Sequence, residues 1–303
     1  MAKHAAVIVT YNRSELLKEC VEAVLLQEKP YDCVVILDNA STDGTSSLLS
    51  AWESREGFII LREKENLGGA GGFCRALHAA METDADWFTI MDDDSVLRKD
   101  FLKEIDRAMQ LHKDCSVLAG VPLTDGLRIG HRRRVSGGLI RREIPVPVEE
   151  YKKDFFYCRI ASFCGLVVSR SAVEEAGYPL ADYFIWYDDT EYCLRLSEKR
   201  PILNWNSAVI DHKAETGSAS QGMTWKDYYG IRNRIRTSAL HYGRLTTWTL
   251  AFYKMGKGCF TFLRMALSGR AEKGAAQLRL VSRAVADGLA GRGGVCESYR
   301  PGS

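Results

Sequence analysis

The sequence lacks the patterns typical of a small secreted, zinc-binding or membrane-spanning protein. Its nine cysteines are scattered and form no Cys-x-x-Cys pair, so we expect reduced thiols in a cytosolic protein. Only four residues precede the first apolar run, residues 5–10, so we expect no secretory signal. Lys254, Lys257 and Arg264 interrupt the most apolar C-terminal segment, so no spanning helix is expected.

Several functional signatures are also missing. No Ser-His-Asp or Cys-His nucleophile pattern is evident, and no glycine-rich segment has the Gly-Lys-Ser/Thr of a Walker A loop. The basic run 132–134 and the basic C-terminal region come without a recognised nucleic-acid-binding module. We therefore expect neither covalent catalysis nor a nucleic-acid partner.

What is present indicates one large domain with an appendage. The chain has 303 residues, of which 46% are apolar, enough for a substantial core. Its net charge of +2 hides an asymmetry, because residues 221–303 contain 14 Lys and Arg but only four Asp and Glu. We expect a catalytic domain over residues 1–225 and a basic helical region over 226–303.

The first hundred residues alternate short β-branched runs with helical patterns, as in βαβ units. The expected strands are residues 7–10, 34–37, 58–61 and 87–90, and helices are expected from Ser14 and near Thr45. This order predicts an α/β fold with a mainly parallel sheet, whose ligands bind at the carboxyl ends of strands. Polar clusters follow three of these strands, at residues 11–13, 38–41 and 92–94.

Three consecutive aspartates, Asp92, Asp93 and Asp94, follow the fourth strand. Carboxylates this close do not stay ionised together without a compensating cation, and oxygen ligands suit Mg²⁺ or Mn²⁺. The alternative is an acidic loop or a helix N-cap, with Asp94 or Ser95 capping a helix before Phe101. Taken alone, the run leaves both interpretations open.

A glycine-rich turn at residues 66–73 precedes another helical pattern. Glycines there let backbone amides approach a diphosphate at a helix N-terminus, but glycine turns more often serve backbone geometry alone.

The segment 184–191 places aromatic residues beside carboxylates at a helix start. A carboxylate next to apolar rings can have its pKa raised towards that of a general base. The alternative is an acidic first helical turn in which Glu191 pairs with Arg195. His212, after another apolar run, is either a structural histidine or a metal ligand.

Two further regions leave alternatives open. Residues 124–154, with the basic run 132–134, are expected to form loops or a hairpin over the sheet, most simply a solvated charged loop. Near the C-terminus, apolar residues recur at helical spacing, and the basic residues Lys254, Lys257 and Arg264 lie largely on another face. The apolar positions are Trp248, Phe252, Met255, Cys259 and Leu263. Such a helix either lies on an anionic membrane or packs on the catalytic domain or a second subunit.

The order of these elements resembles the inverting family 2 glycosyltransferases of the GT-A fold over about residues 3–240. The matching segments are residues 9–13, 38–45, 66–68 with Arg75, 92–94, 163–165, 188–191 and His212. Within the family, the glycine-rich turn, the triple Asp and the aromatic-Asp-Asp-x-Glu segment are most similar to bacterial galactofuranosyltransferases. Rhamnosyltransferases share the Asn-Leu-Gly turn. Tyr187 is a departure, since a Trp usually precedes the Asp pair in galactofuranosyltransferases.

The resemblance implies a role for each matching residue. The nucleoside would be held by Thr10, Tyr11, Asn12, Asp38 and Asn39. The diphosphate or sugar would be fixed by Arg13 and Arg75, next to the turn formed by Asn66, Gly68 and Gly69. A Mn²⁺ or Mg²⁺ ion would be held by Asp92, Asp94 and His212, and Asp93 would touch the ribose or the sugar. Asp189 would be the catalytic base, with Asp188 and Glu191 orienting hydroxyl groups.

These roles imply a metal-dependent hexosyltransferase with a nucleotide-diphosphate sugar as donor, most simply UDP-galactofuranose. A rhamnosyltransferase or another family 2 hexosyltransferase is the alternative, and a non-catalytic nucleotide-sugar-binding scaffold is the alternative from another class. The expected acceptor is a cell-surface glycan, lipid-linked if the C-terminal helix binds membrane. The expected location is the cytoplasm, at the inner face of the cell membrane in the latter case. Assembly into a homo-oligomer stays open.

Overall fold

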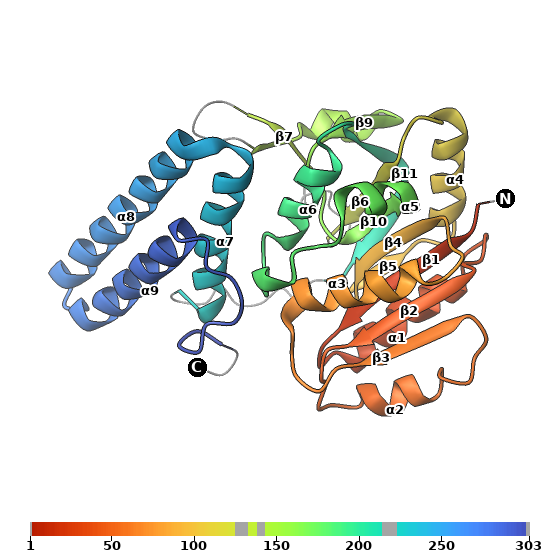
Figure 1. Cartoon of the computed structure of the whole chain (residues 1–303), viewed down its shortest axis with the longest axis horizontal. Coiled ribbons are helices and arrows are strands. Elements are labelled where there is room, and N and C mark those ends of the chain that lie inside the picture. Colours follow the sequence, from red (N-terminus) through yellow and green to blue (C-terminus); the bar gives the residue numbers. More distant parts are fainter. Residues whose placement is uncertain (1, 125–132, 138–142, 214–222, 301–303) are drawn as a thin grey trace. The chain divides into compact units, whose positions relative to one another are not determined.

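The computed structural model describes residues 2–124, 133–137, 143–213 and 223–300, which divide into two compact units (Figure 1). The first contains residues 2–124, 133–136, 143–181 and 189–213. The second contains residue 137, Asp182–Asp188 and the C-terminal helices from residue 223 onward. The sequence placed the domain boundary at residue 225 and gave no sign that the segment Asp182–Asp188 belongs with the later helices.

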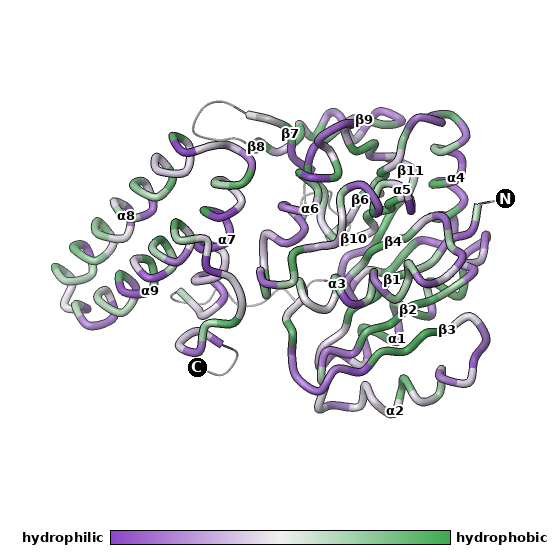
Figure 2. Tube along the Cα trace, viewed as in Figure 1, coloured by the Kyte–Doolittle hydropathy of each residue, from purple (hydrophilic) through white to green (hydrophobic). Residues whose placement is uncertain are grey.

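The first unit is built on a mixed sheet whose N-terminal half is parallel, as the sequence predicts. Strand β1 pairs in parallel with β2 on one side and with β4 on the other, and β2 pairs in parallel with β3. These strands are β1 (His4–Thr10), β2 (Cys33–Asp38), β3 (Phe58–Arg62) and β4 (Trp87–Asp92). Every residue of β1 is buried. A strand that is covered on both faces is typically apolar throughout, and residues 5–9 form such a run, coloured green for hydrophobic in Figure 2.

Beyond β4 the sheet is mixed, because β10 runs antiparallel to both β4 and β6. Strand β11 is parallel to β6 and antiparallel to β5 and β9. The strand order is β3-β2-β1-β4-β10-β6-β11-β5, with β9 beside β11. The bounds are β5 (Ser95–Leu97), β6 (Val117–Leu123), β9 (Phe155–Cys158), β10 (Cys164–Ser169) and β11 (Ile202–His212). Strands β1, β4 and β11 therefore point the same way, and their carboxyl ends share one edge.

Helices cover both faces of this sheet. Ile8 of β1 shares a buried cluster with residues of α1, α2 and α4, whereas the next residue, Val9, faces Gly72 of α3. Successive side chains of a strand point to opposite faces, so α3 lies across the sheet from α1. The helices of this unit are α1 (Ser14–Leu25), α2 (Thr45–Ser50), α3 (Gly68–Met81), α4 (Phe101–Leu111), α5 (Arg170–Ala176) and α6 (Asp188–Leu196, whose first residue is grouped with the second unit).

The expected hairpin lies within residues 124–154, but Arg133 of its basic run is not solvated. Strands β7 (Arg134–Ser136) and β8 (Glu143–Pro145) pair antiparallel, and a 3-10 helix (Val148–Lys152) follows. Arg133 is fully buried, and its guanidinium donates to Asn204, Ser162 and two backbone carbonyls. Buried donors need partners, and these four satisfy the guanidinium. The solvated-loop interpretation is therefore wrong for Arg133. Arg132 lies outside the described residues.

The second unit is a helical bundle with its own core. Its helices are α7 (Trp225–His241), α8 (Gly243–Leu267) and α9 (Ala271–Leu289), and a 3-10 turn (Ala181–Tyr183) leads into it. A capping box of Thr224 and Asp227 starts α7. Within the described ranges, no helix is long and apolar enough to cross a bilayer.

Candidate active site

The acidic run lies at the edge of the sheet where three strands end. Asp92 is the last residue of β4, Thr10 is the last residue of β1, and His212 is the last residue of β11. Asp93 and Asp94 form the tight turn from β4 into β5. Ser95, the first residue of β5, pairs with His212 of the neighbouring strand β11. The helix-cap interpretation is wrong, because residues 95–97 form β5 and the cap position of α4 is Asp100.

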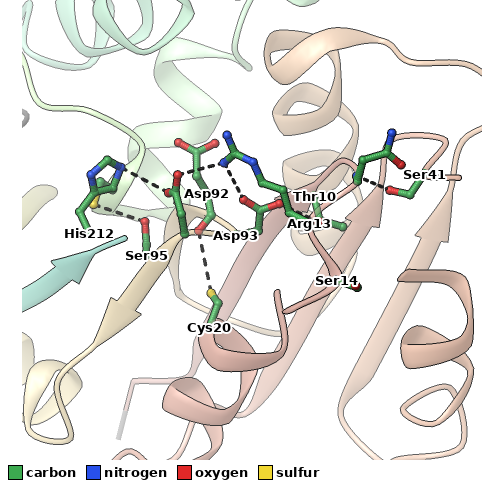
Figure 3. A network of polar contacts seen from close by, with 12 residues as sticks. Thr10, Arg13, Ser14, Cys20, Ser41, Asp92, Asp93, Ser95 and His212 are labelled. Atoms are coloured by element: carbon green, nitrogen blue, oxygen red, sulfur yellow. Dashed lines mark hydrogen bonds and ion pairs between the residues drawn. The ribbon is translucent and has the colours of Figure 1, made fainter. Parts of the chain in front are cut away.

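A chain of polar contacts joins these strand ends (Figure 3). The Thr10 hydroxyl donates to Asp93 Oδ2 at 2.7 Å, and Arg13 Nη1 donates to Asp93 Oδ1 at 3.2 Å and to Asp94 Oδ2 at 3.0 Å. The other Asp94 oxygen lies 3.3 Å from His212 Nε2. Five of the expected site residues, distant in the sequence, are thus directly linked.

The two inner carboxyls of this cluster titrate differently. Burial raises the pKa of Asp93 to about 6, against the opposing effects of the Arg13 charge and the Thr10 hydrogen bond. Burial also raises the pKa of Asp94, but the hydrogen bond and charge of His212 and the charge of Arg13 outweigh it. The pKa of Asp94 therefore lies below its usual value. Asp94 is the carboxylate better held in its ionised form.

We expect the raised pKa of Asp93 to make stability fall with pH in the metal-free protein. The folded state binds a proton more tightly than the unfolded state, whose Asp pKa is about 3.9. The free energy of unfolding therefore falls as the pH rises from about 4 through 6, where Asp93 ionises in the folded protein. Compared with Asp93→Asn, the wild type should lose roughly 2 kcal/mol between pH 4 and pH 7. Urea unfolding in EDTA measures this. An equal pH dependence of both proteins would contradict it.

The chemistry of this cluster fits a divalent cation, although no complete site is preformed. Asp94 Oδ1 is fully buried, and a carboxylate oxygen next to an imidazole nitrogen suits Mn²⁺. Among the described residues, however, no three His, Cys, Asp or Glu side chains are grouped to hold an ion. Magnesium-type sites often use one or two carboxylates and take their remaining ligands from water and substrate phosphates. Asp94 and His212 are the pair that meets this requirement.

Arg13 and Asp93 contact each other in this structure, and their roles at the donor stay predictions. The sequence resemblance assigned Arg13 to the diphosphate or sugar and Asp93 to the ribose or sugar. In the structure both oxygens of Asp93 are engaged within the protein, and its side chain is almost fully buried. Opposite charges near Arg13 outweigh its burial and raise its pKa, so it stays a cation beside the two aspartates.

The loops after β1 and β2 bind each other. Asn12 has a φ of 53°, a left-handed conformation that Asn tolerates better than most residues. Its backbone amide donates to Ser41, and its side-chain oxygen accepts from the Thr42 amide. Asp38, which ends β2, accepts from the Ser41 amide. These bonds fix the loop that contains Asn12 and Tyr11, and the Tyr11 side chain is 38% exposed.

The glycine-rich segment forms the first turns of α3. The side-chain amide of Asn39 binds the start of this helix. Its Nδ2 donates to the Gly68 carbonyl, and its Oδ1 accepts from the Leu67 amide. Asn66 Oδ1 accepts from the Gly68 amide, and Gly68 has a φ of 72°. Asn39, expected at the nucleoside, and Asn66 therefore bind this turn, which begins the helix at Gly68 and Gly69.

Close packing explains at least one of these glycines. A Cβ added to Gly72 would lie 2.7 Å from Val9 Cγ1. Gly72→Ala is therefore expected to destabilise the protein by about 1–3 kcal/mol, because α3 would have to move away from β1. Urea unfolding measures the change. Gly44→Ala is the matched control, since its Cβ would meet its nearest neighbour at an ordinary 3.6 Å. Equal stability of both variants would contradict the packing role.

Arg75 lies on the outer side of α3. Its Nε donates to Glu63 at 3.0 Å, and the side chain is 62% exposed. Among the contacts in the described residues, none joins Arg75 to the Asp93–Asp94 cluster. A role at the diphosphate stays a prediction for this residue.

The start of α6 separates the three carboxylates expected there. Glu191 is buried and pairs with Arg195 at 2.8 Å, which in turn donates to the carbonyls of Ala176 and Tyr178. The i, i+4 alternative is thus what the structure shows for Glu191. Asp189 is half-buried, and its Oδ1 accepts from the amide and the hydroxyl of Thr190. Asp188 is buried and belongs to the second unit.

The aromatic residues before α6 are held in unusual backbone conformations. Phe184, Trp186 and Tyr187 have φ values of 65°, 63° and 68°, which only a strongly constraining environment maintains. The buried Asn233 of α7 supplies that constraint, because its amide donates to the carbonyls of Tyr183, Ile185 and Trp186. Trp186 remains 45% exposed. This segment of the second unit is thus ordered by α7.

Comparison with known proteins gives one family match. The model described as Glycosyl transferase family 2 matches residues 5–177, more than half of the chain. The chain is 28% identical over 208 residues to galactofuranosyltransferase GlfT2 of Mycobacterium tuberculosis, covering 61% of this chain and 32% of that protein. It is 27% identical over 278 residues to GlfT2 of Mycolicibacterium smegmatis, covering 80% and 41%. The chain thus spans about a third to two fifths of the length of these relatives.

A solved structure shares the fold. The mannosyltransferase PcManGT from Pyrobaculum calidifontis, crystallised with GDP-Man and Mn²⁺, matches with a TM-score of 0.55 and 16% identity. The match covers 95% of this chain and 87% of that one.

Proposed function

Because the chain belongs to glycosyltransferase family 2 and has the GT-A fold, we propose that it is a metal-dependent inverting hexosyltransferase. The donor is a nucleotide-diphosphate sugar, and the acceptor is a hydroxyl group of a glycan. The observation that carries this proposal is the cluster in which Thr10, Arg13, Asp93, Asp94 and His212 meet at the carboxyl edge of the sheet. A Rossmann-like sheet binds its nucleotide at this edge.

We assign a separate role in the reaction to each residue of the site. Asp94 and His212 would hold a divalent cation, which as a Lewis acid neutralises charge on the departing diphosphate. Asp189 accepts the proton of the attacking hydroxyl. The hydroxyl attacks the face of the sugar opposite the nucleotide, so a single displacement inverts the anomeric centre without an enzyme nucleophile. Thr10 and Arg13 keep Asp93 in place beside the ion-binding pair.

Galactofuranose is the donor sugar best supported. Both GlfT2 relatives are galactofuranosyltransferases, and the similarity to the M. smegmatis protein extends over 80% of this chain. A screen of UDP-galactofuranose, UDP-galactopyranose, UDP-glucose and dTDP-rhamnose for Mn²⁺-dependent binding and hydrolysis tests the choice. Preference for UDP-galactofuranose is expected. Preference for dTDP-rhamnose would favour a rhamnosyltransferase, and binding of a donor with no turnover would favour a non-catalytic scaffold.

The outer face of α8 supports contact with an anionic membrane. Ala251, Gly258 and Met265 form its inner side, where Gly258 lies against α9. The opposite side carries large apolar residues that are exposed: Leu245, Trp248, Phe252, Leu263 and Leu267. Lys257, five residues after Phe252, and Arg264, next to Leu263, supply positive charge along one edge of this stripe. Aromatic and aliphatic side chains flanked by cations match a bilayer surface with anionic lipids.

Replacing two residues of this face tests the membrane contact. Phe252→Ser combined with Leu263→Ser should lower binding to vesicles containing phosphatidylglycerol at least tenfold, since each change removes apolar area available for burial. Vesicle co-sedimentation measures the effect, and vesicles of phosphatidylcholine alone should bind weakly. The control is Leu111→Ser, an equally exposed leucine at the end of α4. A variant that loses self-association but keeps vesicle binding would instead assign the face to a second subunit.

A further inference from the structure

Arg134, the first residue of β7, is linked by hydrogen bonds to the proposed base. Arg134 Nη2 donates to the Thr190 hydroxyl at 2.6 Å, and that hydroxyl donates to Asp189 Oδ1 at 3.0 Å. Arg134 and Thr190 are 56 residues apart in the sequence, and all three residues belong to the first unit. We propose that Arg134 is a positioning residue that fixes the Asp189 carboxylate through the hydroxyl of Thr190. This role rests on the proposed function.

The backbone on which Arg134 lies is fixed on both sides. Its amide donates to the Ile160 carbonyl at 3.0 Å, and its carbonyl accepts from the amides of Arg159 and Ile160. The preceding residue, Arg133, is fully buried among neutral hydrogen-bond partners. The Arg134 guanidinium is therefore delivered to Thr190 from a constrained backbone and not from a solvated loop.

The direction of the hydrogen bonds explains what the Arg134 cation does beside the Thr190 hydroxyl. A threonine hydroxyl has one proton to donate, and arginine can only donate. With the guanidinium occupying the acceptor side of the Thr190 oxygen, the hydroxyl proton is directed to Asp189 Oδ1. The Thr190 amide donates to the same oxygen. Two donors on Oδ1 hold the plane of the carboxylate, so its second oxygen keeps one orientation for the acceptor hydroxyl.

This arrangement also separates Asp189 from its neighbours on α6. Glu191 is neutralised by Arg195, which lies on the following turn of the same helix. Arg134 comes from β7 and donates to the Thr190 hydroxyl. Arg134 therefore acts on the proposed base, whereas Arg195 anchors the helix through the carbonyls of Ala176 and Tyr178. Loss of the Arg134 contact is expected to affect turnover more than folding.

A set of four variants and their combination tests the role. Arg134→Met and Thr190→Val each remove one link with little change in volume, and each should lower kcat about tenfold to a hundredfold with an unchanged donor KM. Arg134→Lys and Thr190→Ser keep a cation or a hydroxyl and should restore part of the loss. The double variant Arg134→Met/Thr190→Val should be no slower than the worse single variant, because both changes break one chain of contacts. Arg107→Met, which removes an exposed cation of α4, is the charge control.

The outcomes separate this inference from the proposed function. Wild-type kcat in both single variants, or a double variant whose loss is the product of the single losses, would overturn the positioning role while Asp189→Asn stays inactive. Losses of kcat that parallel a fall in unfolding temperature, without partial rescue by Lys or Ser, would also overturn it. An inactive wild type, or a fully active Asp189→Asn, would overturn the proposed function together with this role.

Discussion

Asp189→Asn is expected to lower kcat about a thousandfold, because the amide cannot accept the proton of the attacking hydroxyl. The donor KM should change little, since the proposed contact of Asp189 is with the acceptor. The substitution keeps the size of the side chain and an oxygen that can accept from the Thr190 amide and hydroxyl. Steady-state kinetics with a saturating acceptor measures the loss.

The control for this variant is Glu198→Gln, which neutralises an exposed carboxylate just beyond the end of α6. It should retain wild-type kcat. Activity of Asp189→Asn within a few-fold of the wild type would mean that another group accepts the proton. An equal loss in both variants would point to a general effect of charge.

Asp94→Asn is expected to lower kcat/KM by two to three orders of magnitude, as several kcal/mol of charge stabilisation at the leaving diphosphate are lost. The weakened ion site should show in a higher Mn²⁺ concentration for half-maximal activity. His212→Ala should act in the same direction, because His212 Nε2 lies 3.3 Å from the Asp94 carboxylate. Activity titrated against MnCl₂ measures both effects.

Asp211→Asn is the matched control for the ion site. Asp211 precedes His212 in β11, but its side chain is exposed and pairs with Arg98. This variant should keep the wild-type dependence on Mn²⁺. If Asp94→Asn also kept the wild-type dependence on Mn²⁺, Asp94 would not be an ion ligand. The contacts with Arg13 and His212, which lower the pKa of its carboxyl, would then be its only role.

The parallel half of the sheet could be predicted from the sequence because its signals are local. Each of β1 to β3 is a short apolar run followed by a helix that leads to the next strand, and βαβ connections of this kind place strands in parallel. The antiparallel course of β10 and the short strand β5 gave no comparable signal. Their directions depend on partners far along the chain, since β5 pairs with β11. For the same reason, Asp94 and Ser95 resembled a helix cap.

The candidate site shows the same division between local and distant contacts. The pair of Glu191 and Arg195 was foreseeable because residues four apart adjoin on a helix. The contacts of Arg13 with Asp93 and Asp94 join positions about 80 residues apart, so the sequence pattern indicated that these residues matter but not which partners they bind. For Arg133 and Arg134 the charge pattern predicted solvent exposure. Solvent exposure is a tertiary property. Arg133 is buried against partners in β11 and a loop, and the half-buried Arg134 donates to Thr190 of α6.

The anomeric configuration of the product tests most directly whether this chain is an inverting glycosyltransferase. Wild-type protein is incubated with UDP-galactofuranose, Mn²⁺ and a short saccharide acceptor, and the purified product is analysed by NMR. A new glycosidic bond with the configuration opposite to that of the donor is expected, formed only when the divalent cation is present. A bond with retained configuration, or no product from any of the four candidate donors, would contradict the proposed function.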